Sequence, residues 1–188
     1  MLIDDLTKLP DFYKEGYRGI MLLHRSKDGA DGNPQRTSIK RISSNPTDFD
    51  ILVKELNELR LQRYPEHRIY SSVNSRDMDA CIREFKRRQL DADYDESHMS
   101  NRFYLDIENR FFSCFMNPKC KATSHFLFDC DSKAEYEETK KELHRCSHLI
   151  PTLEYETRNG WHIITPPFNP KGYLFPVEIK KDDLISIA

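Results

Sequence analysis

Short apolar runs alternate with amphipathic segments along most of this chain, and this alternation limits the folds that it can adopt. The strand-like runs are 16–26, 36–43, 67–75, 123–130, 151–157, 161–168 and 175–188, and the segments with helical spacing are 45–64, 76–90, 101–116 and 132–146. Helices alternating with strands and hairpins predict an α+β fold in which helices flank a mixed β-sheet. Thr47 or Asp48 is the expected N-cap of the first long helix.

The 188 residues are enough for a single domain with a substantial core. We expect one domain over residues 1–188, made of an N-terminal hairpin-and-helix lobe (1–68) and a catalytic-type core (69–188). The strand, helix and hairpin of the C-terminal half resemble the ferredoxin-like unit of RNA-recognition motifs.

No window approaches eighteen consecutive apolar residues, and the N-terminal segment lacks the pattern of a secretory signal. We therefore expect a cytoplasmic protein with no membrane segment. Five cysteines, an odd number without a CxxC pair, favour reduced thiols over a disulfide framework. His144, Cys146 and His148 form the densest Cys/His cluster, but four zinc ligands at standard spacing are not visible.

Two aspartates end the apolar run "HFLFDCDS". Alternate residues of a strand share a face, so Asp129 and Asp131 are expected on the same side, about 7 Å apart along the strand. Two neighbouring carboxylates repel each other unless a cation lies between them, and Mg²⁺ or Mn²⁺ prefers such oxygen ligands. The alternative is an exposed strand end at which Asp131 caps the next helix.

A histidine lies inside the apolar run that follows the Asn159-Gly160 turn. The Asn-Gly pair suits the positive φ angles of a tight hairpin turn. His162, the turn amides and Arg158 would together form a phosphate site beside the two aspartates. The alternative is a hydrogen-bonded core histidine.

The segment "CIREFKRRQ" is basic, although the formal net charge of the whole chain is only −2. Arg83, Lys86 and Arg87 would contact nucleic-acid phosphates if this helix follows a template. The alternative is an ordinary solvated helix face.

The motifs "FLFDCD" and "TRNGWHI", in that order and separated by a helix, resemble the archaeo-eukaryotic primase superfamily. The upstream stretch "RIYSSVNSRD" also resembles a strand and turn of primase-polymerases. The resemblance covers about half the chain and implies two divalent metals, Mg²⁺ or Mn²⁺, on Asp129 and Asp131. It also implies that His162 contacts the phosphates of an incoming nucleotide. The third motif is expected at Asp182, with Glu178 as the next candidate and Asp183 nearby.

The resemblance predicts a compact DNA-primase-like nucleotidyltransferase of a phage or mobile element, which makes or extends primers from nucleoside triphosphates on a nucleic-acid template. A helicase or another replication protein would be its partner. One alternative is a non-catalytic module that binds nucleic acid or nucleotides on an RNA-recognition-like sheet. Another is a metal-dependent nuclease, which also needs clustered carboxylates.

Overall fold

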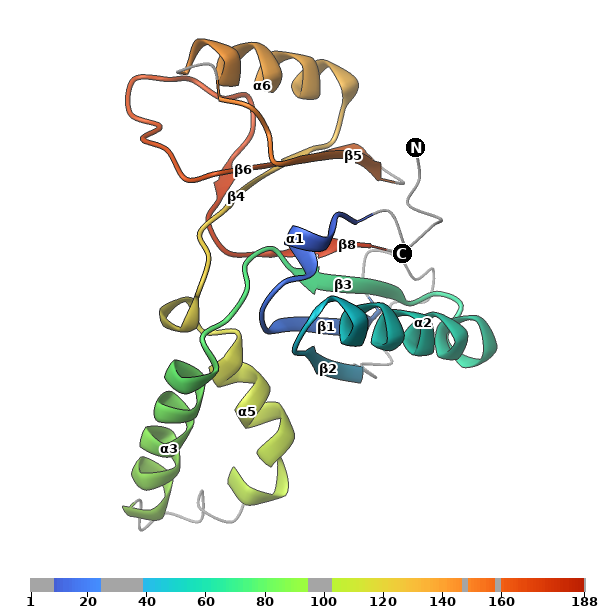
Figure 1. The fold of residues 1–188 in the computed structure, drawn as a ribbon, viewed down its shortest axis with the longest axis vertical. Helices are drawn as coiled ribbons and strands as arrows, with labels where there is room; N and C mark the ends of the chain where they lie inside the picture. The colour runs from blue at the N-terminus through green and yellow to red at the C-terminus, as the bar shows by residue number, and fades with distance from the viewer. Residues whose placement is uncertain (1–8, 25–38, 95–102, 147–148, 158–159, 188) are drawn as a thin grey trace.

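Two four-stranded antiparallel β-sheets form the framework of the computed structural model, shown in Figure 1. It describes residues 9–24, 39–94, 103–146, 149–157 and 160–187. The first sheet has the strand order β2-β1-β3-β8, and the second has the order β5-β6-β4-β7. In chain order the elements are α1 (Asp11–Lys14), β1 (Arg18–Leu23), β2 (Ile39–Ser43), α2 (Pro46–Arg63), β3 (Arg68–Ser72), α3 (Met78–Tyr94), α5 (Ile107–Phe115), a 3-10 turn η2 (Pro118–Cys120), β4 (Phe126–Cys130), α6 (Lys133–Arg145), β5 (Leu153–Thr157), β6 (Gly160–Thr165), β7 (Ile179–Lys180) and β8 (Leu184–Ser186).

The predicted α+β class is confirmed, but the prediction of one mixed sheet was wrong. Every pairing between described strands is antiparallel. The last strand, β8, pairs with β3 rather than with the strands that immediately precede it, with Tyr70 opposite Ser186. Hydrophobic alternation indicates which face of a strand is buried, but it does not identify the partner strand. The expected lobe boundary between residues 68 and 69 falls at the start of β3, whose partner β1 lies in the expected N-terminal lobe.

The first sheet is built around β1, five of whose six residues are buried. Ile20 and Leu22 belong to the same core cluster as Phe49 of α2. Helix α2 begins at Pro46, and the side chain of Asn45 caps it by accepting a hydrogen bond from the Asp48 backbone N–H. The prediction of Thr47 or Asp48 as the N-cap was therefore wrong, because both residues lie inside the first turn. Pro46 is the first residue of the helix, a position that proline favours.

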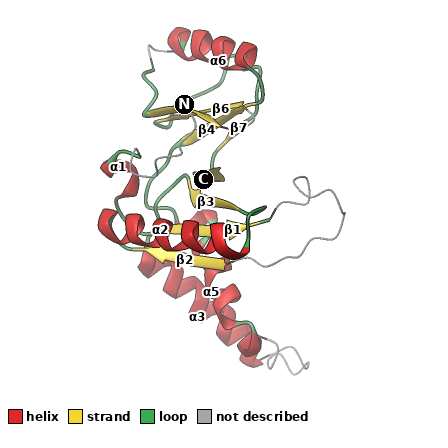
Figure 2. Ribbon diagram, turned by 90° about the vertical axis from the view of Figure 1, so that its right-hand side faces the viewer, coloured by secondary structure: helices red, strands yellow, loops and turns green. Residues whose placement is uncertain are grey.

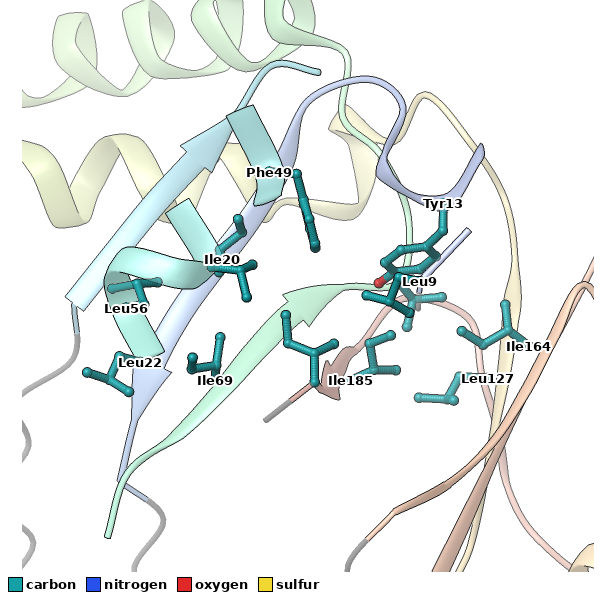
Figure 3. Packing of buried hydrophobic residues seen from close by; sticks show 13 residues of the cluster. Leu9, Tyr13, Ile20, Leu22, Phe49, Leu56, Ile69, Leu127, Ile164 and Ile185 are labelled. Carbon is teal, nitrogen blue, oxygen red and sulfur yellow. The ribbon is translucent and has the colours of Figure 1, made fainter. Parts of the chain in front are cut away.

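The second sheet has β4 and β6 at its centre and buries both of their faces. Phe128 and Ile163 pack with Leu143 of α6 on one face. Leu127 and Ile164 lie on the other face and join the core cluster of the first sheet. Figure 3 shows them close to Tyr13 and Ile185. A continuous apolar core therefore joins the two sheets. Asp129, two residues after Leu127, and His162, two residues before Ile164, also point toward this joint between the sheets.

Helices α3 and α5 form an arm that extends away from the first sheet, as Figures 1 and 2 show. Cys81, Phe115 and Cys120 form a small buried cluster at its base. All five cysteines are free and buried. No helix formed by the described residues combines the length and the apolar character that crossing a bilayer requires.

A buried ion pair lies where the chain passes between the sheets. Arg76, just after β3, donates two hydrogen bonds of 2.9 Å to the carboxylate of Asp182, in the turn between β7 and β8. The Arg76 side chain is 0% exposed and that of Asp182 is 9% exposed. Asn74 adds two bonds at this point: it accepts from the His125 backbone N–H at 2.6 Å and donates to the Lys181 carbonyl at 3.2 Å. Segments from both sheets are thus tied together at one place.

Replacing Asp182 with asparagine should destabilise the fold strongly. The substitution keeps the side-chain volume but leaves the Arg76 guanidinium buried without a counter-charge, which costs about 3–5 kcal/mol of the free energy of unfolding. Urea unfolding of Asp182→Asn measures this loss. Asp91→Asn is the matched control, because it removes the exposed pair with Arg87 and should change stability little. Equal losses in the two variants would contradict a structural role for the Arg76–Asp182 pair.

Candidate functional site

The strands that carry Asp129 and His162 are direct neighbours, and the two residues are paired in register. The imidazole Nε2 of His162 is 3.1 Å from Asp129 Oδ1. Both residues alternate with the inward-facing Leu127 and Ile164, so both side chains point toward the joint between the sheets. His162 is 7% exposed, whereas the Asp129 side chain is 37% exposed. The carboxylate is therefore the part of this pair that solvent and ligands can reach.

A lysine forms an ion pair with the second carboxylate oxygen of Asp129. Lys180 Nζ donates to Asp129 Oδ2 at 2.9 Å and lies 3.3 Å from Asp183 Oδ2. Lys180 belongs to the edge strand β7 and pairs opposite Leu127, which places it on the same face as Asp129. One ammonium group thus neutralises two carboxylates. No pattern in the sequence indicated Lys180, because its position depends on the pairing of a two-residue strand.

A buried tyrosine contacts the other side of the imidazole. Tyr155 on β5 lies directly opposite His162, and its hydroxyl is 2.7 Å from His162 Nδ1. The same hydroxyl lies 3.3 Å from the Ser186 carbonyl of β8, in the first sheet. The tautomer with a proton on Nε2 fits these contacts, because Nε2 can then donate to Asp129 while Nδ1 accepts from the Tyr155 hydroxyl. Tyr155 was also missed by the sequence analysis, although it occupies an inward position of its strand.

The charges of this cluster support one another. The hydrogen bond from His162 is the largest cause that lowers the pKa of Asp129. Burial opposes this effect, and the hydrogen bond from Lys180 adds to it. Burial alone would lower the pKa of Lys180, but the hydrogen bond with Asp129 and the charges of Asp129 and Asp183 raise it. Burial also raises the pKa of Tyr155 well above its usual value. At neutral pH, Asp129 is therefore ionised, Lys180 is charged and Tyr155 is a neutral donor.

The other predicted acids lie elsewhere. Asp131 is exposed, one residue beyond β4, where its backbone N–H donates to the Glu135 carboxylate. Asp182 is engaged by Arg76, and Glu178 is exposed just before β7. The cap of α6 is Ser132, in a capping box with Glu135, and not Asp131. Among the described residues, no group of three or more His, Cys, Asp or Glu side chains is placed to hold a metal ion.

Of four more candidate residues, two lie outside the described part of the chain. Arg158 lies outside the described residues. Its expected role in a phosphate site, together with the turn amides, therefore stays a prediction. His148 of the possible zinc cluster also lies outside them. His144 is in the last turn of α6, and Cys146 is its buried C-cap residue.

The basic helix is partly neutralised by its own acids. Arg87 pairs with both Glu84 and Asp91, and Arg88 also pairs with Glu84. Arg83 and Lys86 are exposed. In Figure 1 their helix, α3, lies at the opposite end of the molecule from β4 and β6.

The glycine of the Gly-x-His motif is required by strand packing. A Cβ atom on Gly160 would lie 2.0 Å from the Cys130 carbonyl oxygen, far inside any tolerable contact. The described glycines with positive φ are Gly16 and Gly172, so the turn argument made from the sequence does not explain Gly160. Close approach of β6 to the end of β4 is what allows Asp129 and His162 to pair in register.

Removing the Tyr155 hydroxyl should disturb His162 without emptying the core. In Tyr155→Phe the nearly buried Nδ1 loses its donor, which should cost about 1–3 kcal/mol of the free energy of unfolding. The ¹⁵N chemical shifts of His162 should change from one tautomer, protonated on Nε2, to a mixture. Tyr136→Phe is the control, because that hydroxyl bonds the exposed Glu154 carboxylate. An unchanged tautomer in Tyr155→Phe would show that Tyr155 does not orient the ring.

Acid should destabilise the wild-type protein more than Asp129→Asn. The folded pKa of Asp129 is depressed below its ordinary value of 3.8. Ionised Asp129 therefore stabilises the fold above that value, and the contribution is lost as the pH falls through the folded pKa. The stability advantage of wild type over Asp129→Asn should be constant above about pH 5 and should shrink as the pH falls from about 5 toward 2 in urea unfolding. Parallel pH profiles would contradict the ion pairs described for Asp129.

Comparisons with known proteins leave the site to be interpreted from its own residues. A scan against protein-family models, a search of curated proteins and a search of solved structures each found no match. The contact of Asp129 with His162 and Lys180 is therefore the feature on which a functional conclusion rests.

Proposed function

We propose that this chain is a nucleotidyltransferase of the archaeo-eukaryotic primase type, which binds a nucleoside triphosphate at Asp129, His162 and Lys180. The observation that carries the proposal is the pairing of Asp129 with His162 on neighbouring central strands. The two motifs that resemble the primase superfamily are separated by the 25 residues from Ser132 to Glu156, and they meet at this pair. A histidine and a carboxylate held side by side are suited to a substrate that carries both phosphate and a hydroxyl nucleophile.

The topology of the second sheet supports the same reading. Strand β4, helix α6 and strands β5, β6 and β7 follow one another as β-α-β-β-β. This is the ferredoxin-like β-α-β-β-α-β order without its second helix. The inward face of the sheet packs against the first sheet through Leu127 and Ile164. A sheet covered in this way offers little room for stacked bases, which disfavours an RNA-recognition mode in which bases stack on the open sheet.

Phosphate would be bound by the nitrogen groups of the cluster. Lys180 presents an ammonium with three donors, and its side chain is 32% exposed. His162 lies behind it, held by Asp129 and Tyr155. Charge-assisted hydrogen bonds from such groups to phosphate are among the stronger ones in proteins.

The chemistry of the donor set suits a divalent ion, because two carboxylates already share one cation, the Lys180 ammonium. Asp129 and Asp183 would hold Mg²⁺ or Mn²⁺, and phosphate oxygens of the nucleotide and water would complete its coordination. When bound, the ion would supply Lewis acidity for nucleotidyl transfer. In this proposal Asp183 takes the third-motif place for which the sequence analysis preferred Asp182, since Asp182 is bound to Arg76.

The nucleic-acid template would be contacted by the arm. Arg83 and Lys86 are exposed on α3, whereas the guanidinium of Arg87 is shared between two acids. Template phosphates would thus be bound mainly by Arg83 and Lys86, and their binding would weaken with salt.

Nucleotide binding without chemistry is a second candidate function. Lys180 neutralises both carboxylates that would otherwise be free for catalysis, and this observation favours a binding module. The two candidates differ in one assay. A nucleotidyltransferase incorporates labelled nucleotide on a primed template in the presence of Mn²⁺, whereas a binding module retains the triphosphate unchanged.

The test of the site itself is triphosphate affinity in His162→Gln. Losing the imidazole that holds Asp129 in place should weaken binding of a fluorescent, non-hydrolysable nucleoside triphosphate by about tenfold or more, which corresponds to at least about 1.4 kcal/mol. His67→Gln is the matched control, because His67 and His162 are both 7% exposed. The control should lose stability to a similar degree but keep its triphosphate affinity. If both variants bind the triphosphate like wild type, the proposed site is wrong.

A further inference from the structure

Lys180 occupies the position at which the two accessible carboxylates of the site converge. Its Nζ is 2.9 Å from Asp129 Oδ2 and 3.3 Å from Asp183 Oδ2. The remaining oxygen of Asp129 is held by His162. A cation that enters from solvent to bind Asp129 and Asp183 together must therefore compete with this ammonium. The lysine keeps the carboxylates neutralised for as long as it stays.

The same lysine is placed to leave. It is one of the two residues of β7, at the edge of the second sheet, and its side chain is 32% exposed. A lysine has a flexible four-carbon stem, and its ammonium is readily hydrated. Moving the ammonium away from Asp129 breaks two ion pairs but opens no cavity in the core, because Lys180 is outside the buried clusters.

A divalent ion and a triphosphate would each favour that movement. A divalent ion carries twice the charge of the ammonium and prefers carboxylate oxygens, so it would displace Lys180 from Asp129 and Asp183. The displaced ammonium would then lie beside the anion-binding side of the site, where phosphate oxygens can accept its hydrogen bonds. A triphosphate, in turn, would draw the lysine away from the carboxylates and free them for the ion. Two ligands that favour the same state bind with positive and reciprocal coupling.

Building on the proposed function, we propose that Lys180 is an internal counter-ion, bound to Asp129 and Asp183 in the ligand-free protein and transferred to phosphate when metal and nucleoside triphosphate bind together. Lys180 therefore makes the empty site a poor metal site and couples metal binding to triphosphate binding. No bond is formed or broken in this exchange: one ammonium changes partners while a divalent ion takes its place.

The test is calorimetric titration of Mn²⁺ into the full chain, with and without a saturating non-hydrolysable nucleoside triphosphate. Wild type should bind Mn²⁺ more tightly when the triphosphate is present, by about 5- to 150-fold. Lys180→Met keeps much of the stem but removes the charge. It should bind Mn²⁺ more tightly than wild type in the absence of triphosphate, and the effect of the triphosphate should largely disappear.

Three further variants make the result specific. Lys180→Arg keeps a cation at the site and should retain weak Mn²⁺ binding without triphosphate. Lys181→Met is the neighbouring control, because Lys181 is exposed and its backbone carbonyl, not its ammonium, makes the recorded contacts with Asn74 and Lys121. It should behave like wild type. Asp129→Asn should lose Mn²⁺ binding in either condition. Melting temperatures of all variants establish that each is folded under the titration conditions.

The possible results separate this inference from the proposed function. If wild type binds Mn²⁺ and triphosphate but Lys180→Met has the same Mn²⁺ affinity and the same coupling, the counter-ion role is overturned and the proposed site stands. If neither wild type nor Lys180→Met binds Mn²⁺ or triphosphate, the proposed function fails, and the counter-ion role fails with it. Tighter Mn²⁺ binding in Lys180→Met, with loss of coupling, supports the role of Lys180.

Discussion

The buried Arg76–Asp182 ion pair is the interaction on which the relation between the two sheets depends. Arg76 follows a strand of the first sheet, and Asp182 lies in the turn between the last strand of the second sheet and the strand that returns to the first. Both charges are nearly inaccessible to water, so each is tolerable only while the other is present. With this turn fixed, β7 and β8 are held in different sheets. As a result, Lys180 faces Asp129 in one sheet while Ser186 meets Tyr155 from the other.

The candidate site is a row of four polar side chains, each of which contacts the next. The Tyr155 hydroxyl contacts His162 Nδ1, His162 Nε2 contacts Asp129, and Asp129 accepts a further hydrogen bond from Lys180. The buried end of this chain is the Tyr155 phenol, and the more exposed end is the ion pair of Asp129 with Lys180. In the proposed exchange of the Lys180 partner, the contacts of His162 with Tyr155 and Asp129 would keep the orientation of the imidazole.

Local features of the sequence predicted most of the elements and one part of the site. Alternation along 123–130 and 161–168 placed Asp129 on the face of Leu127 and His162 on the face of Ile164, but both faces of these strands are buried, so the pattern did not show which face meets the first sheet. The contacts with Lys180 and the Arg76–Asp182 pair could not be predicted in this way. They join residues 51 and 106 positions apart, and their geometry depends on strand partners. The cap at Asn45 depends on local features that the prediction of Thr47 or Asp48 overlooked. Pro46 takes the first helical position, so the cap must precede it, and Asp48 instead accepts a hydrogen bond from the Ser44 backbone N–H.

Gly160 and His162 are two residues apart, yet natural selection would constrain them for different reasons as related proteins diverge in sequence. A side chain at Gly160 would collide with the Cys130 carbonyl oxygen in any protein that keeps the pairing of β4 and β6, whatever that protein binds. His162 has no such steric requirement, and a chain that abandoned its ligand could replace it with another side chain able to bond Tyr155. Retention of the glycine would then record common ancestry of the fold, whereas retention of the histidine would record selection on chemistry. A lineage with the glycine alone would have kept the scaffold after the site had ceased to be used.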